Sequence, residues 1–526
     1  MKRIWIAATL LLQAAALCYG QATYDLVIRN GTVVDGSGKK AFRTDIGIRD
    51  GLIARIGNLR GARAGEVIDA KGLVVAPGFI DIHTHADGIA GSPLAENFVR
   101  MGVTTVVPGN CGGSAMPIGE ALQKIREAGV AANFATLIGH NTVRRAVMGT
   151  EQRAPTAEEL SRMKDLVARA MSEGAVGLST GLEYVPGTYS GADEIIELAR
   201  EAARAGGLYA SHMRNEGTEI EKSIAETIHV GETAGCPVHI SHLKIDSPSR
   251  WGASAAVVSM IEAARRRGLA VTADMYAYSA ASSGLSIRFP TWALQGGEAQ
   301  VRVRLEDPAT WEKIQDEMME TLEARGFHDL SWAVIASYRA DPSLEGLSIK
   351  DAAFRLKGEG SSEAQLEVAR DMMLNGGASM VYHLMSEADI RRFMLYPHVS
   401  IASDSSLLTF GEGAPHPRGY GNNPRVLSYY VRQRKVLSLE EAIRRMTSLP
   451  AAQFGFEKRG LIREGFAADL VVFDRNRVQD RATYANPHQY PTGIGWVIIN
   501  GLPVVRDGSP TAARPGRILR RSPAAR

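Results

Sequence analysis

The chain has 526 residues, of which 45% are hydrophobic and 22% are charged, a balance that can bury a large core. Its 60 basic and 57 acidic side chains leave a net charge of +3, too small to create the positive field that nucleic-acid binding requires. The composition therefore indicates a globular protein and argues against a nucleic-acid partner.

The first 22 residues have the pattern of a secretory signal peptide. Lys2 and Arg3 precede an apolar stretch (residues 4–17) and a small-x-small cleavage site (residues 20–22). The stretch is short for a membrane span, and the leucine before Cys18 disfavours lipid anchoring at that cysteine. We expect the protein to be exported to the periplasm, with no integral membrane segment after the signal peptide is removed.

Both ends of the mature chain have the alternation and turn signals of β-structure. Asn30-Gly31 and Asp50-Gly51 lie between short apolar runs near the start, and Asn500-Gly501 does so near the end. These signals predict hairpins, and together one small β-sandwich built from residues 23–76 and 456–526. Its second half ends in a basic tail, for which a solvated tail and an anion-binding segment are the two interpretations.

The middle, residues 77–455, alternates short apolar strands with amphipathic helices. One helix begins at Thr156 with a capping box to Glu159 and carries apolar residues at Met163, Val167 and Met171. Eight strand candidates end at His85, Cys111, His140, Thr180, Arg214, Lys244, Tyr278 and Ser405. This pattern predicts an α/β fold, a TIM-like (β/α)₈ barrel, with its chemistry at the C-terminal ends of the strands. The interval after Tyr278 is too long for one crossover, so we expect an inserted subdomain, about residues 285–382, near the barrel mouth.

Polar residues that bind metals stand at these strand ends. His83 and His85 are two apart, so in a strand both imidazoles point to one face. The other candidates at strand ends are Cys111, His212, His242 and Asp404. Nitrogen, sulfur and carboxylate ligands together favour zinc. The alternatives are partly buried structural histidines and, for Cys111, a disulfide with Cys236.

Several motifs carry a resemblance to the amidohydrolase superfamily, in particular to the N-acyl-D-amino-acid deacylases (D-aminoacylases). They are Gly-Phe-Ile-Asp-Ile-His-Thr-His-Ala-Asp from Gly78, Pro-Gly-Asn-Cys-Gly at Cys111, Gly-Leu-Ser-Thr-Gly-Leu-Glu-Tyr-Val-Pro-Gly from Gly177, Ser-His-Met-Arg-Asn-Glu at His212, Ile-Ser-His-Leu-Lys at His242, and His-Pro-Arg at Arg418. The similarity extends over nearly the whole mature chain.

The resemblance implies a role for each residue. A tight zinc would be held by Cys111, His212 and His242, and a weaker second site by His83, His85, Cys111 and Asp404. Many relatives bridge their metals with a carboxylated lysine on strand four, but residues 175–180 contain no lysine, in agreement with a bridging cysteine. The substrate carboxylate would be held by Lys244, Tyr276, Ser282 and Arg418.

The chemistry of these residues supports the same function. Asp404 can act as general base, and the planar fork of Arg418 matches a carboxylate. We expect zinc-dependent hydrolysis of N-acyl-D-amino acids, a small-molecule substrate class. The open alternatives are a dipeptidase, a cyclic-amide (hydantoinase-like) hydrolase and a non-catalytic binding protein. Arg418 and Lys244 could also be surface charges, and Tyr276 and Ser282 packing residues. The segment after Asp404 differs from that of better-known D-aminoacylases, so the substrate side chain is less well determined than the metal site.

Overall fold

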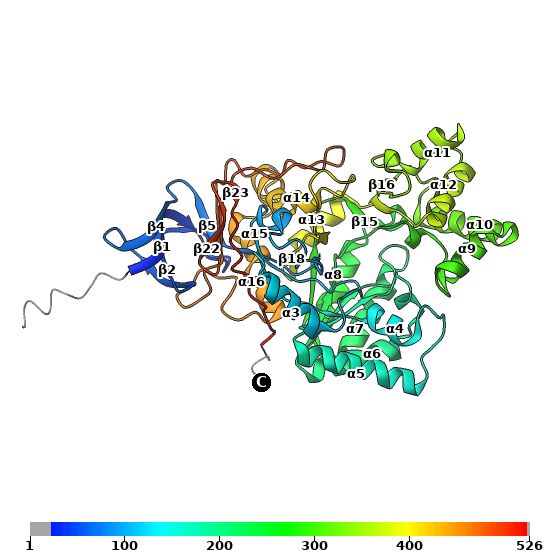
Figure 1. The fold of residues 1–526 in the computed structure, drawn as a ribbon, viewed down its shortest axis with the longest axis horizontal. Coiled ribbons are helices and arrows are strands. Elements are labelled where there is room, and N and C mark those ends of the chain that lie inside the picture. The colour runs from blue at the N-terminus through cyan, green and yellow to red at the C-terminus, as the bar shows by residue number, and fades with distance from the viewer. Residues whose placement is uncertain (1–22, 523–526) are drawn as a thin grey trace, which may run out of the picture.

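The computed structural model describes residues 23–522, which form three parts arranged in a row (Figure 1). A β-sheet made from both ends of the chain lies at one end of the molecule, and a barrel of strands and helices lies in the middle. The subdomain that carries α9–α12 projects at the opposite end. The predicted signal peptide, with Cys18, lies outside the described residues. Between residues 23 and 522, no helix is long and apolar enough to cross a membrane.

Eight parallel strand positions form the barrel, which confirms the predicted (β/α)₈ fold. In chain order they are β6 (Phe79–Asp81), β8 (Val103–Val106), β9 (Asn133–Phe134) continued by β10 (Ile138–Gly139), β11 (Gly177–Gly181), β12 (Leu208–His212), β13 (Val238–Ile240), β14 (Val271–Met275) and β18 (Val399–Ile401). Closure occurs where β19 (Ser405–Ser406) pairs in parallel with β7 (Thr84–His85). The Asp404 N–H also donates to the His83 carbonyl at 2.9 Å, so the eighth strand position returns to the first.

Helices follow the strands and cover the barrel. The main ones are α3 (Ile118–Ala128), α4 (His140–Met148), α5 (Ala157–Glu173), α6 (Ala192–Arg204), α7 (Ile220–Ala234), α8 (Ser254–Arg266), α13 (Glu387–Leu395), α14 (Arg418–Arg425), α15 (Leu439–Met446) and α16 (Ser448–Phe454). The capping box predicted for α5 is present, because Thr156 and Glu159 each bond the other's backbone N–H. Met163 and Val167 are fully buried on the inner face of α5.

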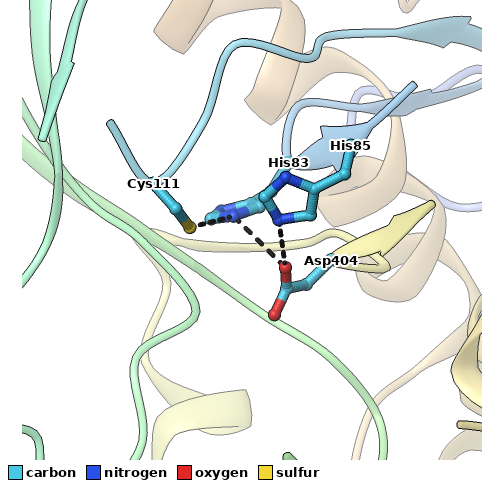
Figure 2. A group of neighbouring side chains, drawn as sticks. All are labelled: His83, His85, Cys111 and Asp404. Atoms are coloured by element: carbon cyan, nitrogen blue, oxygen red, sulfur yellow. Dashed lines mark hydrogen bonds and ion pairs between the residues drawn. The ribbon is translucent and has the colours of Figure 1, made fainter. Parts of the chain in front are cut away.

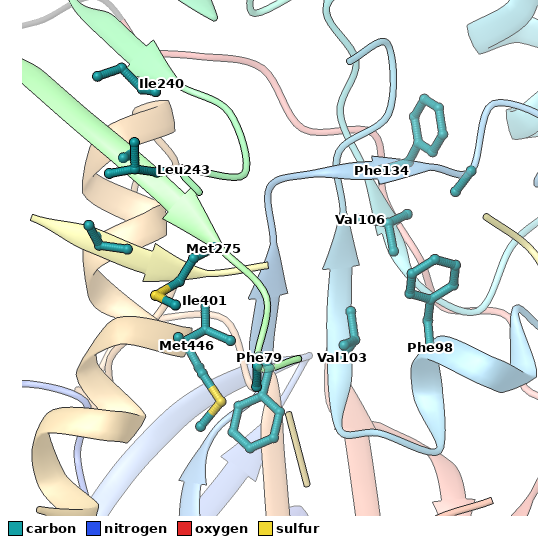
Figure 3. Close-up of a cluster of buried hydrophobic side chains, with 14 of the residues drawn as sticks. Phe79, Phe98, Val103, Val106, Phe134, Ile240, Leu243, Met275, Ile401 and Met446 are labelled. Carbon is teal, nitrogen blue, oxygen red and sulfur yellow. The ribbon is translucent and has the colours of Figure 1, made fainter. Parts of the chain in front are cut away.

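A large apolar core joins the strands to their helices. Phe79 and Val103 come from the first two barrel strands, and Met275 and Ile401 come from the last two (Figure 3). These side chains are at most 2% exposed. Because each strand is held against its neighbours by this packing, the strand ends are fixed relative to one another.

The terminal sheet contains nine strands from both ends of the chain. They are β1 (Thr23–Val33), β2 (Phe42–Arg49), β3 (Leu52–Gly57), β4 (Arg63–Asp69) and β5 (Val74–Pro77), with β20 (Leu470–Phe473), β21 (Ile494–Ile499), β22 (Leu502–Arg506) and β23 (Ser509–Pro510). The two halves meet where β5 pairs antiparallel with β20. Strands distant in this order, such as β3 and β21, place Ile53 and Ile498 in one shared core. The sheet is therefore curled over its own core, as a small sandwich is.

One predicted hairpin of this sheet is wrong. The turn expected at Asn30-Gly31 is an irregularity within the single long strand β1, whose pairing with β2 shifts register between Ile28 and Gly31. Asn30 has a left-handed φ of 60°, but the strand continues because β4 and β5 pair with its other edge. Pairing on both edges keeps β1 extended through Asn30-Gly31, where the local sequence favours a turn.

The inserted subdomain begins at β15 (Ala280–Gly284), five residues before the expected start. Its three strands, β15, β17 (Ser379–His383) and β16 (Ala333–Ser337), form an antiparallel sheet. Helices α9 (Glu298–Glu306), α10 (Pro308–Arg325), α11 (Ile349–Lys357) and α12 (Ser362–Leu374) complete it. Because Trp311, Ile335 and Tyr382 belong to a separate hydrophobic cluster, this part has its own core.

Up to residue 522, the arginine-rich end of the chain packs against the barrel and is not a free solvated tail. The Gly516 N–H and the Leu519 N–H donate to the carbonyls of residues 130 and 134 beside the third barrel strand. Arg514 donates to the Ala128 carbonyl, where α3 ends, and Arg520 to the Glu173 carbonyl, where α5 ends. These arginines therefore cap helices, a role that cations fill well because carbonyls at helix C-termini lack partners.

Candidate metal centre and active site

All six predicted metal ligands lie at the C-terminal end of the barrel. His83 and His85 follow β6, Cys111 follows β8, His212 ends β12, His242 follows β13 and Asp404 follows β18. Their donor atoms fall into two groups, each with all atoms within 4.8 Å of one another: His83, His85, Cys111 and Asp404, and Cys111, His212 and His242. Cys111 is common to both groups, so its sulfur lies between them.

The first group is compact. His83 Nε2 lies 3.3 Å from Cys111 Sγ and 3.4 Å from Asp404 Oδ1, and His85 Nε2 lies 3.1 Å from the same carboxylate oxygen (Figure 2). Figure 2 shows all four side chains directed at one small space. His83 is fully buried, whereas the His85 side chain is 36% exposed, so this group lies on the side open to the cavity.

The second group is buried more deeply. Cys111 Sγ lies 3.4 Å from His242 Nε2, and His212 Nδ1 lies 2.8 Å from the same nitrogen. His212 and His242 are 3% and 2% exposed. Two nearly buried histidines and the shared cysteine make a better-sheltered set of ligands than the first group, which includes the partly exposed His85.

The donor set fits zinc. Ligand atoms about 2.0–2.3 Å from one tetrahedral zinc lie roughly 3.3–3.7 Å apart. The separations of 3.3 and 3.4 Å between Cys111 Sγ and the imidazole nitrogens of His83 and His242 match this spacing. Nitrogen and sulfur donors also favour zinc over magnesium or calcium, which prefer oxygen ligands.

Three of the candidate ligands have strained backbones. Cys111, His242 and Asp404 have φ values of 52°, 35° and 51°, a left-handed conformation that costs residues other than glycine about 1–3 kcal/mol. Hydrogen bonds hold two of them there, since the His242 N–H donates to Asp274 Oδ1 at 2.8 Å and the Asp404 N–H donates to His83 O. Such strain at three converging side chains is typical of a functional site.

The charges at the centre keep its anions ionised. Burial alone would raise the pKa of the Cys111 thiol, but His83 and His242 hold this pKa well below its usual value. Burial would likewise raise the pKa of Asp404, which Arg418 and His83 instead hold well below the ordinary range. Thiolate and carboxylate are the forms that bind metal, and an ionised Asp404 can accept a proton.

Two buried aspartates that sequence reasoning missed orient the ligands. Asp274 Oδ2 accepts from His83 Nδ1 at 3.1 Å and from His239 Nε2 at 2.7 Å. Asp81 accepts from the Ser403 N–H at 3.0 Å, next to Asp404, and burial raises the pKa of Asp81 to about 7. Asp81 stands in the His-x-His motif and could have been noticed there, whereas Asp274 lies in an apolar strand with no local signal.

The four predicted substrate-binding residues line one cavity with the metal ligands. This cavity of about 600 Å³ lies at the barrel mouth, and its walls include Lys244, Tyr276, Ser282 and Arg418. Arg418 Nη1 lies 3.0 Å from Asp404 Oδ2, and its guanidinium stacks 4.6 Å from the Tyr276 ring centre. The Arg418 guanidinium is buried and faces the cavity, where its planar fork can donate to a ligand carboxylate.

The other three substrate-binding candidates have protein partners as well. Lys244 pairs with Glu216 and lies 2.9 Å from His242 Nδ1, so it contacts the ligand set directly. Ser282 Oγ donates to the Met380 carbonyl at 2.9 Å, and the Tyr276 hydroxyl lies 3.7 Å from the sulfur of Met385. All three nevertheless face the cavity that contains Arg418.

Two glutamates beside the ligands orient histidines. Glu183 lies 3.1 Å from His212 Nε2, and Glu216 lies 3.0 Å from His242 Nδ1. His140 bonds Glu194 at 2.8 Å and is not among the cavity residues, as a structural histidine would be. Cys111 and Cys236 are both free thiols, which excludes the disulfide alternative.

Relatives of known sequence share nearly the whole chain. A family model described as "Amidohydrolase family" matches residues 66–505. D-aminoacylase of Alcaligenes xylosoxydans xylosoxydans is 35% identical over 95% of this chain and 98% of its own length. N-acyl-D-glutamate deacylase of the same organism is 36% identical over 95% of this chain and 97% of its own.

Solved structures of the same group of enzymes share the fold of this chain. A crystal structure of D-aminoacylase matches with a TM-score of 0.82 at 33% identity, covering 95% of this chain and 100% of that one. N-acyl-D-glutamate deacylase from Bordetella bronchiseptica, in complex with zinc and a phosphonate mimic of the tetrahedral intermediate, matches at 0.82 with 34% identity and the same coverage. A D-hydantoinase at 18% identity and a TM-score of 0.57 shows the shared fold alone. The chain therefore belongs to the amidohydrolase family, within its D-aminoacylase group.

Proposed function

We propose that this protein is a zinc-dependent hydrolase that cleaves the amide bond of N-acyl-D-amino acids and releases a carboxylate and a free D-amino acid. The observation that carries the proposal is the position of Arg418: its buried guanidinium pairs with Asp404 at the edge of the metal-ligand set and lines the cavity. The similarity to D-aminoacylase and to two deacylases of acidic D-amino acids supports the same reaction.

Cys111, His212 and His242 would hold a tight zinc, and His83, His85, Cys111 and Asp404 a weaker second one. The deeper burial of the first set supports this ranking. A structure of D-aminoacylase is described in terms of a binuclear centre with one-metal activation and second-metal attenuation. Bound zinc would supply a Lewis acid that activates water and polarises the amide carbonyl.

Asp404 would be the proton carrier. Its Oδ1 faces the histidines, and its Oδ2 faces Arg418, so the carboxylate stands between the ligand set and the substrate-binding wall. It would accept a proton from the attacking water and return it to the amide nitrogen as the C–N bond breaks. The low pKa of Asp404 keeps it ready to accept that proton.

Arg418 and Lys244 would fix the α-carboxylate of the substrate, with Tyr276 and Ser282 beside them. A planar guanidinium can bond both carboxylate oxygens, which orients the amino acid about its α-carbon. Once the carboxylate and the amide are both fixed, only one configuration places the side chain in the remaining space. This is how the site would select D over L substrates.

We also propose that the protein is exported, to the periplasm in an organism with two membranes, on the strength of the charged, apolar and small-residue pattern of residues 1–22. N-terminal sequencing of protein purified from the native host tests this. A mature N-terminus near residue 23 supports export, and an intact Met1 in the cytosolic fraction contradicts it.

The test of the main proposal is an assay of zinc-loaded protein against enantiomer pairs of N-acetyl-amino acids, with hydantoins and dipeptides in parallel. Release of acetate from the D-enantiomers supports the proposal. Cleavage confined to L-enantiomers, hydantoins or dipeptides would contradict it.

A further inference from the structure

His416 is a buried histidine in the wall of the active-site cavity, two residues before Arg418 and only 4% exposed. Both of its ring nitrogens contact backbone groups. Nδ1 accepts from the Arg418 N–H at 3.0 Å, and Nε2 donates to the Ala280 carbonyl at 2.9 Å. Since an N–H only donates and a carbonyl only accepts, these partners fix a neutral ring with its proton on Nε2. Burial and the nearby Arg418 hold the pKa of His416 well below its usual value, in agreement with a neutral ring.

The two partners of His416 belong to segments that carry predicted substrate-binding residues. Arg418 begins α14, where backbone N–H groups have no partner within the helix, so the bond from its N–H to His416 fixes the start of this helix. Ala280 begins β15, and the cavity residue Ser282 follows it by two positions on the same strand. One imidazole therefore joins two cavity-lining segments that are 136 positions apart in the sequence.

Aromatic side chains hold this imidazole in one orientation. The ring centres of Tyr278 and Tyr484 lie 5.3 and 5.2 Å from that of His416, at interplanar angles of 87° and 84°, which is an edge-to-face arrangement. The Tyr484 hydroxyl also accepts from the Ala280 N–H at 3.1 Å. Ala280 is thus held through both of its backbone groups, and the His416 ring cannot turn without losing two hydrogen bonds.

We propose that His416 is a positioning residue for substrate binding, which holds Arg418 and Ser282 at the separation that one α-carboxylate can bridge. The inference rests on the proposed function and adds a residue that acts through Arg418, because both nitrogens of the His416 ring are already taken. Binding groups must be held within about 0.5 Å of their productive positions, and a displacement of about 1 Å can cost about 100-fold in rate. Loss of His416 would remove the contact that ties the start of α14 to the start of β15.

The experiment removes the two hydrogen bonds of His416 separately and together. His416→Asn keeps an acceptor near the position of Nδ1, His416→Gln keeps a donor near the position of Nε2, and His416→Phe keeps only a ring that packs against the tyrosines. His140→Gln is the matched control, because His140 is also buried but bonds Glu194 outside the cavity. Thermal unfolding and zinc content show whether each variant is folded and loaded.

The substrate is N-acetyl-D-methionine, and kcat and KM are measured separately. His416→Phe should raise KM by about 10–100-fold with a much smaller change in kcat, because the carboxylate is bound in the ground state and in the transition state alike. His416→Asn and His416→Gln should each recover part of this loss, and His140→Gln should keep the wild-type KM. A KM that rises equally in His140→Gln, or that neither partial replacement recovers, would overturn the inference.

A double-mutant cycle shows whether His416 acts through Arg418. In the Arg418→Leu background, His416→Phe should lower kcat/KM by less than about twofold, because the group that it positions is already gone. If His416→Phe costs the same factor in both backgrounds, the two residues act independently and the inference fails. His416→Asn replaces His416→Phe in this cycle if the latter does not fold.

Failure of the proposed function has a different signature. If the wild type cleaves no N-acyl-D-amino acid, the hydrolase proposal fails, and calorimetric binding of N-acetyl-D-methionine to zinc-loaded protein then tests the inference. Binding that weakens in His416→Phe and in Arg418→Leu, but not in His140→Gln, would sustain a positioned carboxylate clamp. Absence of binding by the wild type, or binding that His416→Phe leaves unchanged, would overturn it.

Discussion

Asp274 Oδ2 accepts a hydrogen bond from His83 Nδ1 at 3.1 Å, which directs the opposite ring nitrogen, Nε2, at Cys111 and Asp404. The same carboxylate accepts from the backbone N–H of His242, a ligand of the other group. One buried side chain therefore orients members of both metal-ligand groups.

Replacing this carboxylate tests its role. Asp274→Asn removes an acceptor that both His83 and His239 use, so zinc affinity should fall by about 10–100-fold, as it does when such supporting groups are lost elsewhere. Competition with a chromophoric chelator measures the affinity. Asp389→Asn is the matched control, since Asp389 is also buried but bonds Ser254 and Gly252 far from the ligands. Unchanged zinc affinity in Asp274→Asn would contradict this role.

The two cysteines should differ in reactivity. In zinc-free protein the Cys111 thiol, with its lowered pKa, is already a thiolate at neutral pH, so its alkylation rate should change little between about pH 6 and 9. Burial raises the pKa of Cys236 to about 11, so Cys236 should stay unreactive and serve as an internal control. Added zinc should block alkylation of Cys111. Peptide mass spectrometry measures both sites; a Cys111 rate that climbs about tenfold per pH unit, or that zinc leaves unaltered, would count against the assignment.

Asp404→Asn separates proton transfer from metal binding. Asparagine cannot carry the proton between water and the amine, so kcat should drop by about 10²–10⁴-fold. Zinc bound by Cys111, His212 and His242 should remain, as measured by atomic absorption. Retention of more than a tenth of the wild-type kcat would remove Asp404 from its proposed role.

Arg418→Leu should weaken recognition of the α-carboxylate. Because the donor is buried, the loss in kcat/KM for N-acyl-D-amino acids should be about 10²–10³-fold. An N-acylated alkylamine, which has no carboxylate, provides the comparison: wild type and variant should cleave it equally slowly. If the variant loses activity on both compounds to the same extent, Arg418 acts on the metal-ligand set and not on the substrate.

The arginines near the C-terminus should contribute to stability and not to catalysis. Changing Arg514, Arg520 and Arg521 to Ala removes side-chain donors to carbonyls at the ends of α3, α5 and α16, each worth about 0.3–1 kcal/mol. Thermal unfolding should therefore begin at a lower temperature, while KM and kcat stay at wild-type values. A change in KM without a change in Tm would instead point to a role at the substrate site.

Much of this site could be predicted from the sequence because each ligand follows an apolar run that ends in a polar residue. His83, Cys111, His242 and Asp404 all stand just beyond a barrel strand, and the barrel rule places strand ends together. The capping box at Thr156 was predictable for a similar reason, since both partners lie within one helical turn.

The residues that sequence reasoning missed depend on contacts between distant segments. Asp274 faces His83 across 191 positions of sequence, and no local pattern marks it as different from a core residue. His416 contacts Ala280 across 136 positions, at the start of an insertion whose docking on the barrel mouth no periodicity reveals. The hairpin wrongly expected at Asn30-Gly31 failed in the same way, because pairing partners on both edges of β1 decided its course.

The most direct test of the account combines zinc content with enantiomer selectivity in one preparation. Wild-type protein should retain about one tightly bound zinc after dialysis and release acetate from N-acetyl-D-amino acids but not from their L-enantiomers. Cys111→Ser should lose both properties together, because its sulfur belongs to both ligand groups. A Cys111→Ser protein that keeps its zinc and its D-selective activity would contradict the central claim.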